Sequence, residues 1–406
     1  MLDILIKNAS EIVTCSGSGP RIGDDLGRLD TLEGGDLGIR EGKIVAIGDL
    51  NEDARQVINA RGKTVLSGFV DCHTHLVFSG SREDEFALKV RGTDYLEILK
   101  EGGGILSTVR RTREATLSEL VAAAGPRMRM ASAYGTTTME VKSGYGLDSA
   151  NELKMLTAVR QLRGDDGMDL VPTFLGAHAV PPEFTNDRDA YVGRVAEMLD
   201  ELQAHSVAEY CDVFVEEGAF SAGEARKILL KARDHGLKLK LHAAEFSDIG
   251  GVELGVELGA SSIDHLDCIS EQGIRQMADR GTVGVLLPGV PFHLMTGRYA
   301  PARKMVDAGV PIALATDFNP GSCPTLSMQM IIALACRYMR LTPAEALNAS
   351  TINAAYALDR GDRIGSLEVG KQADIAILNI VNHRQLPYWF GMNLVDRVIK
   401  NGKTVN

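Results

Sequence analysis

The middle of the chain, from about residue 66 to 364, alternates between short apolar runs and segments with helical periodicity. The apolar runs have strand character, and hydrophobic residues in the segments between them recur every three or four positions, which is typical of helices packed on a sheet. Repeated strand–helix units of this number indicate a (β/α)8 barrel, in which active sites lie at the carboxyl ends of the strands. The eight predicted strands are residues 68–76, 136–144, 170–178, 211–218, 237–246, 261–267, 282–288 and 311–319.

Both ends of the chain carry strand patterns without long helices between them. Residues 1–65 contain short strand-like runs separated by turn residues, and residues 365–406 contain runs that flank Asn401-Gly402. Asn-Gly is the preferred dipeptide of a two-residue hairpin turn. We therefore expect a smaller β-sandwich domain formed by both chain ends, residues 1–65 and 365–406, beside an α/β TIM-like barrel of residues 66–364.

The composition limits the classes of partner. The chain has 406 residues, of which 45% are hydrophobic and 24% charged, and its net charge is −11. An acidic chain without a basic stripe is not expected to bind nucleic acid or an anionic membrane. No apolar stretch reaches the length of a membrane span and no signal-peptide pattern is visible, so we expect a cytoplasmic protein. Its six cysteines have no CxxC spacing, which favours reduced thiols.

Residues of metal-ligand type follow several of the predicted strands. His73 and His75 stand two positions apart at the end of the first strand, and alternate side chains of a strand share one face. Such a pair, taken alone, fits two structural histidines as well as a metal site. His242, His265 and Asp317, however, each follow a later predicted strand. Because all strand ends of a barrel meet at one mouth, these residues together predict a metal site there.

Long stretches of the sequence resemble the metal-dependent amidohydrolase superfamily. The order HxH, His, His, Asp on predicted strands one, five, six and eight is that of the superfamily. Within it, the chain is similar to the members that hydrolyse the ring amide of 4-imidazolone-5-propanoate to N-formimidoyl-L-glutamate in histidine degradation. Two departures from their pattern are Cys72, where proline is usual, and Ala244, where an acidic residue is expected. The resemblance covers nearly the whole chain and rests on HTHLVFSGSRE, GGGILSTVR, EVKSGYGLD, VPTFLGAHAVP, CDVFVEEG, LATDFNPGSCPT and GDRIGSLEVGKQADIAIL.

The resemblance also implies roles for individual residues. Binuclear members often carry a lysine at the end of the fourth strand, but VFVEEG has none, so one Zn²⁺ or iron ion per chain is expected. Its implied ligands are His73, His75, His242 and Asp317, and the implied catalytic groups are Glu245, His265 and Asp317. The implied substrate contacts are Arg82, Tyr95, Tyr145, His178, Glu245, Asn319, Gly321 and Ser322.

These roles have a chemical logic. Arg82 offers a guanidinium matched to the propionate, while His265 and Asp317 are expected to orient water and pass its proton to the leaving nitrogen. Glu245 would hydrogen-bond to the ring or act as a base. Lys142, at the end of the second predicted strand, is expected to support the site without binding the metal. Taken singly, each group also has a structural interpretation, as a surface arginine, a packing aromatic, a plain turn or a core histidine.

Two further expectations concern the surroundings of the site. Residues 91–115, with the Gly102–Gly104 run, are predicted to form a helix and a lid over the barrel mouth, although a structural excursion that only covers the barrel fits the same pattern. A homodimer is expected from the superfamily. Two other functions stay open at this point: a different cyclic amidohydrolase or aminohydrolase, such as a deaminase of a ring heterocycle, and a metal-binding barrel without catalytic activity.

Overall fold

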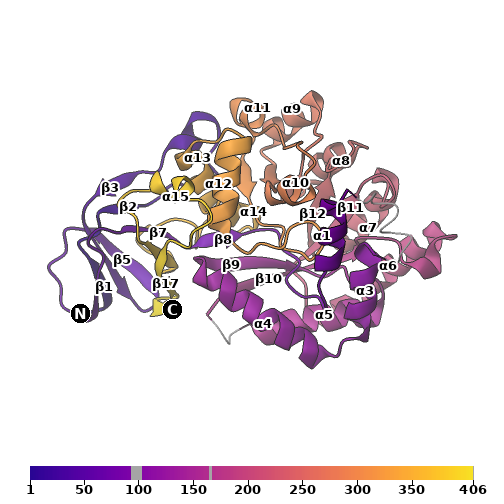
Figure 1. Cartoon of the computed structure of the whole chain (residues 1–406), viewed down its shortest axis with the longest axis horizontal. Helices are drawn as coiled ribbons and strands as arrows, with labels where there is room; N and C mark the ends of the chain where they lie inside the picture. The colour runs from indigo at the N-terminus through magenta and orange to yellow at the C-terminus, as the bar shows by residue number, and fades with distance from the viewer. Residues whose placement is uncertain (93–102, 164–166, 406) are drawn as a thin grey trace.

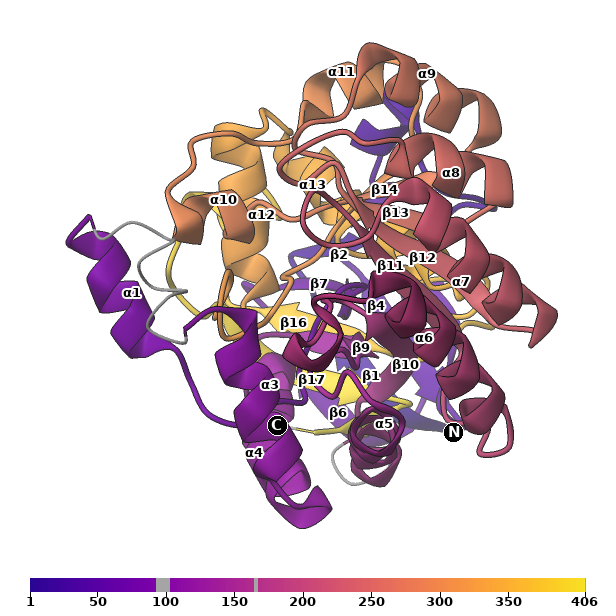
Figure 2. The ribbon, with the colours of Figure 1, turned by 90° about the vertical axis from the view of Figure 1, so that its right-hand side faces the viewer.

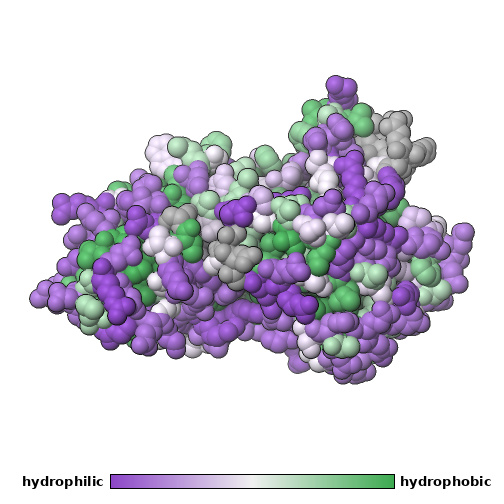
Figure 3. Space-filling model, turned by 90° about the horizontal axis from the view of Figure 1, so that it is seen from below, coloured by the Kyte–Doolittle hydropathy of each residue, from purple (hydrophilic) through white to green (hydrophobic). Residues whose placement is uncertain are grey.

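The structure, a computed structural model, describes residues 1–92, 103–163 and 167–405. Tyr95 and much of the predicted lid therefore lie outside the described residues. Figure 1 shows the barrel on one side of the molecule and the terminal strands, with both chain ends, on the other. None of the described helices is long and apolar enough to span a membrane. The face seen in Figure 3 is largely hydrophilic, with scattered apolar side chains.

Eight parallel strands form the barrel, and consecutive strands are neighbours throughout. Past the ends of the first and last strands, Thr74 forms a parallel bridge with Phe318, and the His75 amide donates to the Phe318 carbonyl at 2.9 Å. The Asp71 carboxylate also accepts from the Thr316 amide and hydroxyl, at 2.9 and 2.6 Å. These bonds join the two edges of the sheet. The strands are β8 (Phe69–Asp71), β9 (Thr136–Lys142), β10 (Asp169–Ala177), β11 (Tyr210–Val215), β12 (Lys238–Ala243), β13 (Ser262–His265), β14 (Val283–Leu286) and β15 (Ile312–Leu314).

The first strand is shorter than the sequence pattern predicts. It ends at Asp71, so His73 and His75 follow the strand and do not lie within it. Beyond β8 the chain stays bonded to both neighbouring segments, because the Asp317 amide donates to the His73 carbonyl and the Lys142 amide donates to the Thr74 carbonyl, at 2.9 Å each. The two imidazoles nevertheless point to the same region, because the extended conformation continues past the last ladder bond.

Helices surround the strands, as Figure 2 shows with the barrel end of the molecule facing the viewer. Their ends carry the expected signals: Thr342 and Ser221 form capping boxes with Glu345 and Glu224, and Gly281 ends a helix in the left-handed conformation. The helices are α1 (Glu83–Val90), α3 (Ile105–Glu114), α4 (Leu117–Ala133), α5 (Ser149–Leu162), α6 (Arg188–Gln203), α7 (Ala222–Asp234), α8 (Gly251–Leu258), α9 (Glu271–Arg280), α10 (Gly289–Leu294), α11 (Ala302–Asp307), α12 (Met328–Tyr338), α13 (Pro343–Ala349), α14 (Ile352–Ala357) and α15 (Gln385–Tyr388), with 3-10 turns η1 (Gly23–Gly27) and η2 (Pro182–Phe184).

The chain ends form two further sheets that share an apolar core. One has the order β5-β4-β1-β6, and the other, β18-β17-β16-β7-β2-β3, combines strands from both ends of the chain. Asn401 and Gly402 form the predicted hairpin turn, with φ of 51° and 71°. The barrel with a β-sandwich built from both chain ends is thus confirmed. The strands are β1 (Leu2–Lys7), β2 (Glu11–Val13), β3 (Thr31–Glu33), β4 (Asp36–Arg40), β5 (Lys43–Gly48), β6 (Ala54–Asn59), β7 (Thr64–Ser67), β16 (Ile375–Leu378), β17 (Val395–Lys400) and β18 (Lys403–Thr404).

Candidate active site

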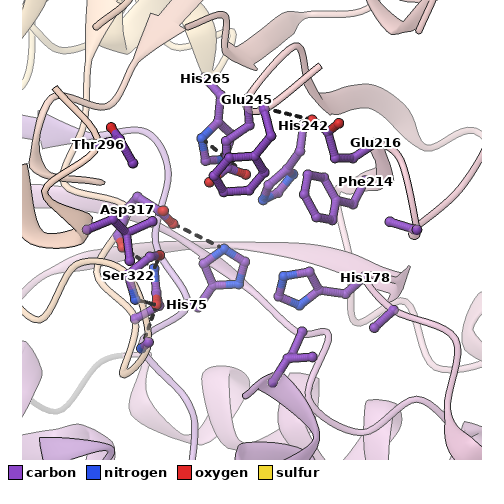
Figure 4. A pocket seen from close by; sticks show the side chains of 18 of the residues that line it. His75, His178, Phe214, Glu216, His242, Glu245, His265, Thr296, Asp317 and Ser322 are labelled. Atoms are coloured by element: carbon purple, nitrogen blue, oxygen red, sulfur yellow. Dashed lines mark hydrogen bonds and ion pairs between the residues drawn. The ribbon is translucent and has the colours of Figure 1, made fainter. Parts of the chain in front are cut away.

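A cavity of about 750 Å³ opens at the carboxyl ends of the barrel strands. Figure 4 shows histidines and carboxylates from several strands converging in it. The residues singled out in the sequence that line it are His75, Arg82, Tyr145, His178, His242, Glu245, His265, Asp317, Asn319, Gly321 and Ser322. Because these residues are scattered over more than 240 positions of sequence, their convergence is a property of the barrel.

The deepest part of the cavity holds a cluster of imidazoles around Asp317. Oδ1 of Asp317 lies 3.4 Å from Nε2 of His73 and 3.3 Å from Nε2 of His75. The ring centroids of His73 and His242 lie 4.4 Å apart. Nε2 of His73, Nε2 of His242 and Oδ1 of Asp317 are buried and have no hydrogen-bond partner among the described residues. Buried polar atoms are costly when unpaired, so this donor set fits a metal ion.

Carboxylates behind two of these histidines fix their orientation. Nδ1 of His73 lies 2.6 Å from Asp264, and Nδ1 of His242 lies 3.0 Å from Asp212. Each carboxylate accepts a hydrogen bond from the Nδ1–H group, which leaves the Nε2 lone pair for a metal, the arrangement usual for metal-binding histidines. His178 and His265 are also close enough to join three-residue ligand groups with these histidines. Among the described residues, no carboxylate lies within hydrogen-bond distance of Nδ1 in either of them: Nδ1 of His178 faces the Gly144 carbonyl at 3.0 Å, and Nδ1 of His265 lies 3.6 Å from Glu245.

The two orienting carboxylates belong to a fully buried ion network that the sequence analysis missed. Lys142 lies 2.6 Å from Asp212, 3.0 Å from Glu140 and 3.5 Å from Asp264. Lys240 lies 2.7 Å from Glu140 and donates to the Cys72 carbonyl at 2.9 Å. The supporting role predicted for Lys142 fits this position. Burial opposes the charged form of Lys142, but the surrounding carboxylates raise its pKa, so it stays protonated.

The positive charges of the lysines in this network do not cancel the negative charges of its carboxylates. The two lysines face three carboxylates, and Asp317 adds a further negative charge at the ligand cluster. With neutral histidines, these four carboxylates carry two more charges than the two lysines offset. A divalent cation supplies the offsetting charge, which is a second indication that the site suits a metal.

The backbone is strained where the strands end at the cavity. Ala244, His265, Leu266 and Asp317 adopt positive φ values of 54°, 79°, 66° and 51°, although none of them is glycine. This conformation costs energy for residues with a Cβ and is concentrated at functional sites. This conformation changes the direction of the chain at His265 and Asp317, where their strands end. At Ala244 it begins the turn that carries Glu245.

Glu245 and His265 face each other at the upper wall of the cavity, with Oε2 and Nδ1 3.6 Å apart. Burial raises the pKa of Glu245 well above its usual range, and the nearby Asp317 adds to the shift. Burial also lowers the pKa of His265 to about 4, despite the opposing effect of Asp317. Near neutral pH the imidazole of His265 is therefore neutral, and burial favours the protonated form of the Glu245 carboxyl group.

Arg82 and the turn after β15 form the wall on the other side. Arg82 makes a two-point contact with Glu85, at 3.0 and 2.8 Å, and its guanidinium packs against Gly321, where a side chain would collide with it. The side-chain oxygen of Asn319 accepts hydrogen bonds from the backbone amides of Gly321 and Ser322, at 2.8 Å each, within the same turn. Asn319 therefore shapes the turn that presents Ser322 to the cavity.

Other cavity residues were not expected from the sequence. Phe214 and Glu216 lie in the CDVFVEEG stretch that supports the resemblance, but no role was expected for them, because Glu216 is one of two adjacent acids and Phe214 is an ordinary strand aromatic. Among the unexpected lining residues are Lys89, Phe214, Glu216, Phe246 and Thr296.

Comparison with known proteins identifies the family. A model of the amidohydrolase family matches residues 64–405. The chain belongs to the amidohydrolase family. An imidazolonepropionase of Alkaliphilus metalliredigens is 50% identical over 100% of this chain and 98% of its own length. One of Geobacillus thermodenitrificans is 47% identical, again over 100% of this chain and 98% of its own length.

The fold of an amidohydrolase is also seen in solved structures. A crystal structure of an adenosine deaminase from Xanthomonas campestris with bound zinc matches with a TM-score of 0.73. The match covers 99% of this chain and 92% of that chain, at 20% identity. At this identity the similarity shows the shared fold. Membership of the amidohydrolase family agrees with the His and Asp cluster at the barrel mouth, which suits a metal ion.

Proposed function

We propose that this chain is an imidazolonepropionase, a metal-dependent hydrolase that opens the ring amide of 4-imidazolone-5-propanoate to give N-formimidoyl-L-glutamate in histidine degradation. The observation that carries the proposal is the identity of 45 to 50% with imidazolonepropionases over essentially the full length of the chain. The cavity supports it, because it combines a metal-type donor cluster with an arginine for the propionate and an acid and a base for proton transfer.

We further propose that a single Zn²⁺ or iron ion is held by His73, His75, His242 and Asp317. The unpaired atoms of this set and the excess of buried carboxylate charge support the assignment. His73 and His242 are preferred over His178 and His265 because Asp264 and Asp212 hold their Nδ1 atoms. When bound, such an ion polarises the amide carbonyl and lowers the pKa of water toward about 7.

The protein groups then divide the proton transfers. His265 is neutral near pH 7, so its free Nδ1 can accept a proton from the attacking water, with Asp317 orienting that water. Glu245, whose pKa is raised by burial, lies beside His265, and its protonated form can donate a hydrogen bond to a ring nitrogen. The leaving nitrogen must gain a proton as the C–N bond breaks, and the His265 and Glu245 pair is placed to deliver it.

Arg82 is proposed to bind the propionate. Its guanidinium is nearly buried and now pairs with Glu85, so the substrate carboxylate would share the guanidinium with Glu85 or displace it. Tyr145, His178 and Ser322 line the space between Arg82 and the metal-type cluster, where the ring would lie. Gly321 allows Arg82 to approach this space, because a side chain there would occupy the position of the guanidinium. Tyr95 is kept as a proposed contact and lies outside the described residues.

A turnover assay tests the proposal directly. The purified protein, loaded with zinc, is mixed with freshly generated 4-imidazolone-5-propanoate, and N-formimidoyl-L-glutamate is followed by NMR, with elemental analysis on the same sample. We expect turnover and one metal per chain, both lost after chelation and restored by zinc. Absence of turnover in the zinc-loaded protein, with ammonia released from a ring heterocycle such as adenosine instead, would favour an aminohydrolase.

We also propose that the enzyme works in the cytoplasm as a homodimer. Its cysteines are all free, as is usual in a reducing compartment. The side chains of Tyr388, Trp389 and Phe390 are 67%, 47% and 61% exposed in consecutive positions, and exposed aromatics of this kind are enriched in protein interfaces.

A further inference from the structure

A buried glutamate outside the cavity anchors one of its walls. Glu152 lies in the first turn of α5 and is fully buried. Its Oε1 accepts hydrogen bonds from the Gly146 and Leu147 amides at 2.8 Å each, and its Oε2 accepts from the Gly144 amide at 3.0 Å. One carboxylate thus binds three backbone amides of the six-residue loop, residues 143–148, that joins β9 to α5 and carries Tyr145.

The loop has little freedom to adopt another position. A methyl group added at Gly146 would lie 2.5 Å from the backbone nitrogen of Glu152, so the loop rests directly on the helix. Leu147 has a positive φ of 56°, a conformation that needs support from its surroundings. The hydroxyl of Tyr191 donates to the Gly176 carbonyl at 2.7 Å and lies 3.3 Å from the Leu147 carbonyl. Tyr191 thus links the loop to the end of β10, two residues before His178.

The anchored loop determines the protonation pattern of His178. The Gly144 carbonyl lies 3.0 Å from Nδ1 of His178, and a carbonyl can only accept, so Nδ1 must carry the proton. The lone pair of the neutral ring is then on Nε2. The ring is stacked on His75 with centroids 5.0 Å apart, and Tyr145 lies 5.4 Å away, so this part of the cavity is tightly defined.

We propose that Glu152 is a positioning residue for substrate recognition: by holding the 143–148 loop it places Tyr145 in the cavity and fixes His178 as the Nδ1–H tautomer. Nε2 of His178 is then a hydrogen-bond acceptor. It selects an N–H group of the substrate ring and not the carboxylate, which has no hydrogen to donate. This inference rests on the proposed function, because the imidazolone ring supplies that N–H.

The test uses Glu152→Gln in the zinc-loaded full-length protein. Glutamine keeps the size of the side chain but turns an NH₂ group toward backbone amides that also donate, so the loop loses part of its anchor. We expect KM for 4-imidazolone-5-propanoate to rise about tenfold, kcat to change less than threefold, and the metal content to stay at the wild-type value. Tyr191→Phe removes one hydroxyl without burying a new polar group and should raise KM by a smaller factor, about two- to threefold.

A second readout does not depend on the substrate. In protein labelled with ¹⁵N-histidine, the Nδ1–H proton of His178, assigned by its absence in His178→Asn, should exchange slowly in the wild type. In Glu152→Gln it should exchange at least tenfold faster. This measurement tests the anchoring of His178 whether or not the wild-type protein hydrolyses 4-imidazolone-5-propanoate. If the wild-type protein does not hydrolyse it, the proposed function is contradicted, while the exchange rate still tests the anchoring.

Glu345→Gln is the matched control. Glu345 is also a buried glutamate in the first turn of a helix and accepts from the Thr342 amide at 2.7 Å and from Arg303 at 2.9 Å, but it does not line the cavity. We expect it to lower the melting temperature without changing KM or the His178 signal. The inference is overturned if Glu152→Gln leaves KM and the exchange rate unchanged. It is also overturned if both variants raise KM in proportion to their loss of stability.

Discussion

Replacing Lys142 by methionine tests the buried ion network that supports the metal-type histidines. The change removes a charge from between Glu140, Asp212 and Asp264 while keeping a side chain of similar length. Removing one partner of a fully buried ion pair costs about 3 to 5 kcal/mol, because the other charges stay buried without compensation. The entropy of unfolding of about 2.1 cal/mol/K per residue near 60 °C amounts to roughly 0.85 kcal/mol/K for this chain. The expected loss is therefore about 4 to 6 °C in melting temperature.

Calorimetry of the zinc-loaded proteins measures this loss. Lys227→Met is the control, since Lys227 is 67% exposed and lies 3.9 Å from Asp189, and it should melt within about 1 °C of the wild type. A Lys142→Met protein that melts with the control would refute the electrostatic explanation.

Three further predictions concern the cavity and the surface. His242→Ala should reduce bound metal to less than about a tenth of the wild-type content, whereas His265→Ala should keep the metal and lower kcat by roughly 10² to 10⁴, as measured by elemental analysis and steady-state kinetics. Arg82→Ala should lower kcat/KM about 10- to 150-fold, equivalent to roughly 1.5 to 3 kcal/mol, and should spare a neutral analogue without the carboxylate; equal losses on both substrates would contradict a carboxylate contact. Trp389→Asp should convert a dimer to a monomer in light scattering, and an unchanged mass would place the interface elsewhere.

The barrel and the ligand-type residues were predictable because their signals are local. His73, His75, His242 and Asp317 each come just after an apolar run, and the geometry of a parallel barrel brings all such positions to one mouth. The caps at Thr342 and Gly281 and the turn at Asn401 are also set by neighbouring residues. Closure of the barrel by Thr74 and Phe318 was not visible, because it depends on strands that are far apart in sequence.

The ion network was not predictable for the same reason. Glu140, Lys142 and Lys240 alternate with apolar residues in their strands, a pattern that in an isolated strand indicates a solvated face. In a closed barrel that face is the interior, and the pairing of Lys142 with Asp212 across 70 positions depends on the register of β9, β10 and β11. The anchoring by Glu152 was hidden because its partners are backbone amides, which carry no sequence signal.

The mixed sheet at the chain ends has a consequence for synthesis of the protein. β7 pairs with β2 and with β16, and the Thr64 hydroxyl bonds to the Ile380 carbonyl across 316 positions. At roughly 5 to 20 residues per second, a ribosome needs roughly 15 to 60 s to make the chain between them. Throughout that time the edge of β7 has no partner, and an unpaired strand edge is a site of aggregation. Slower elongation lengthens this interval, so the yield of folded protein depends on how the nascent N-terminal strands are shielded until the last thirty residues emerge.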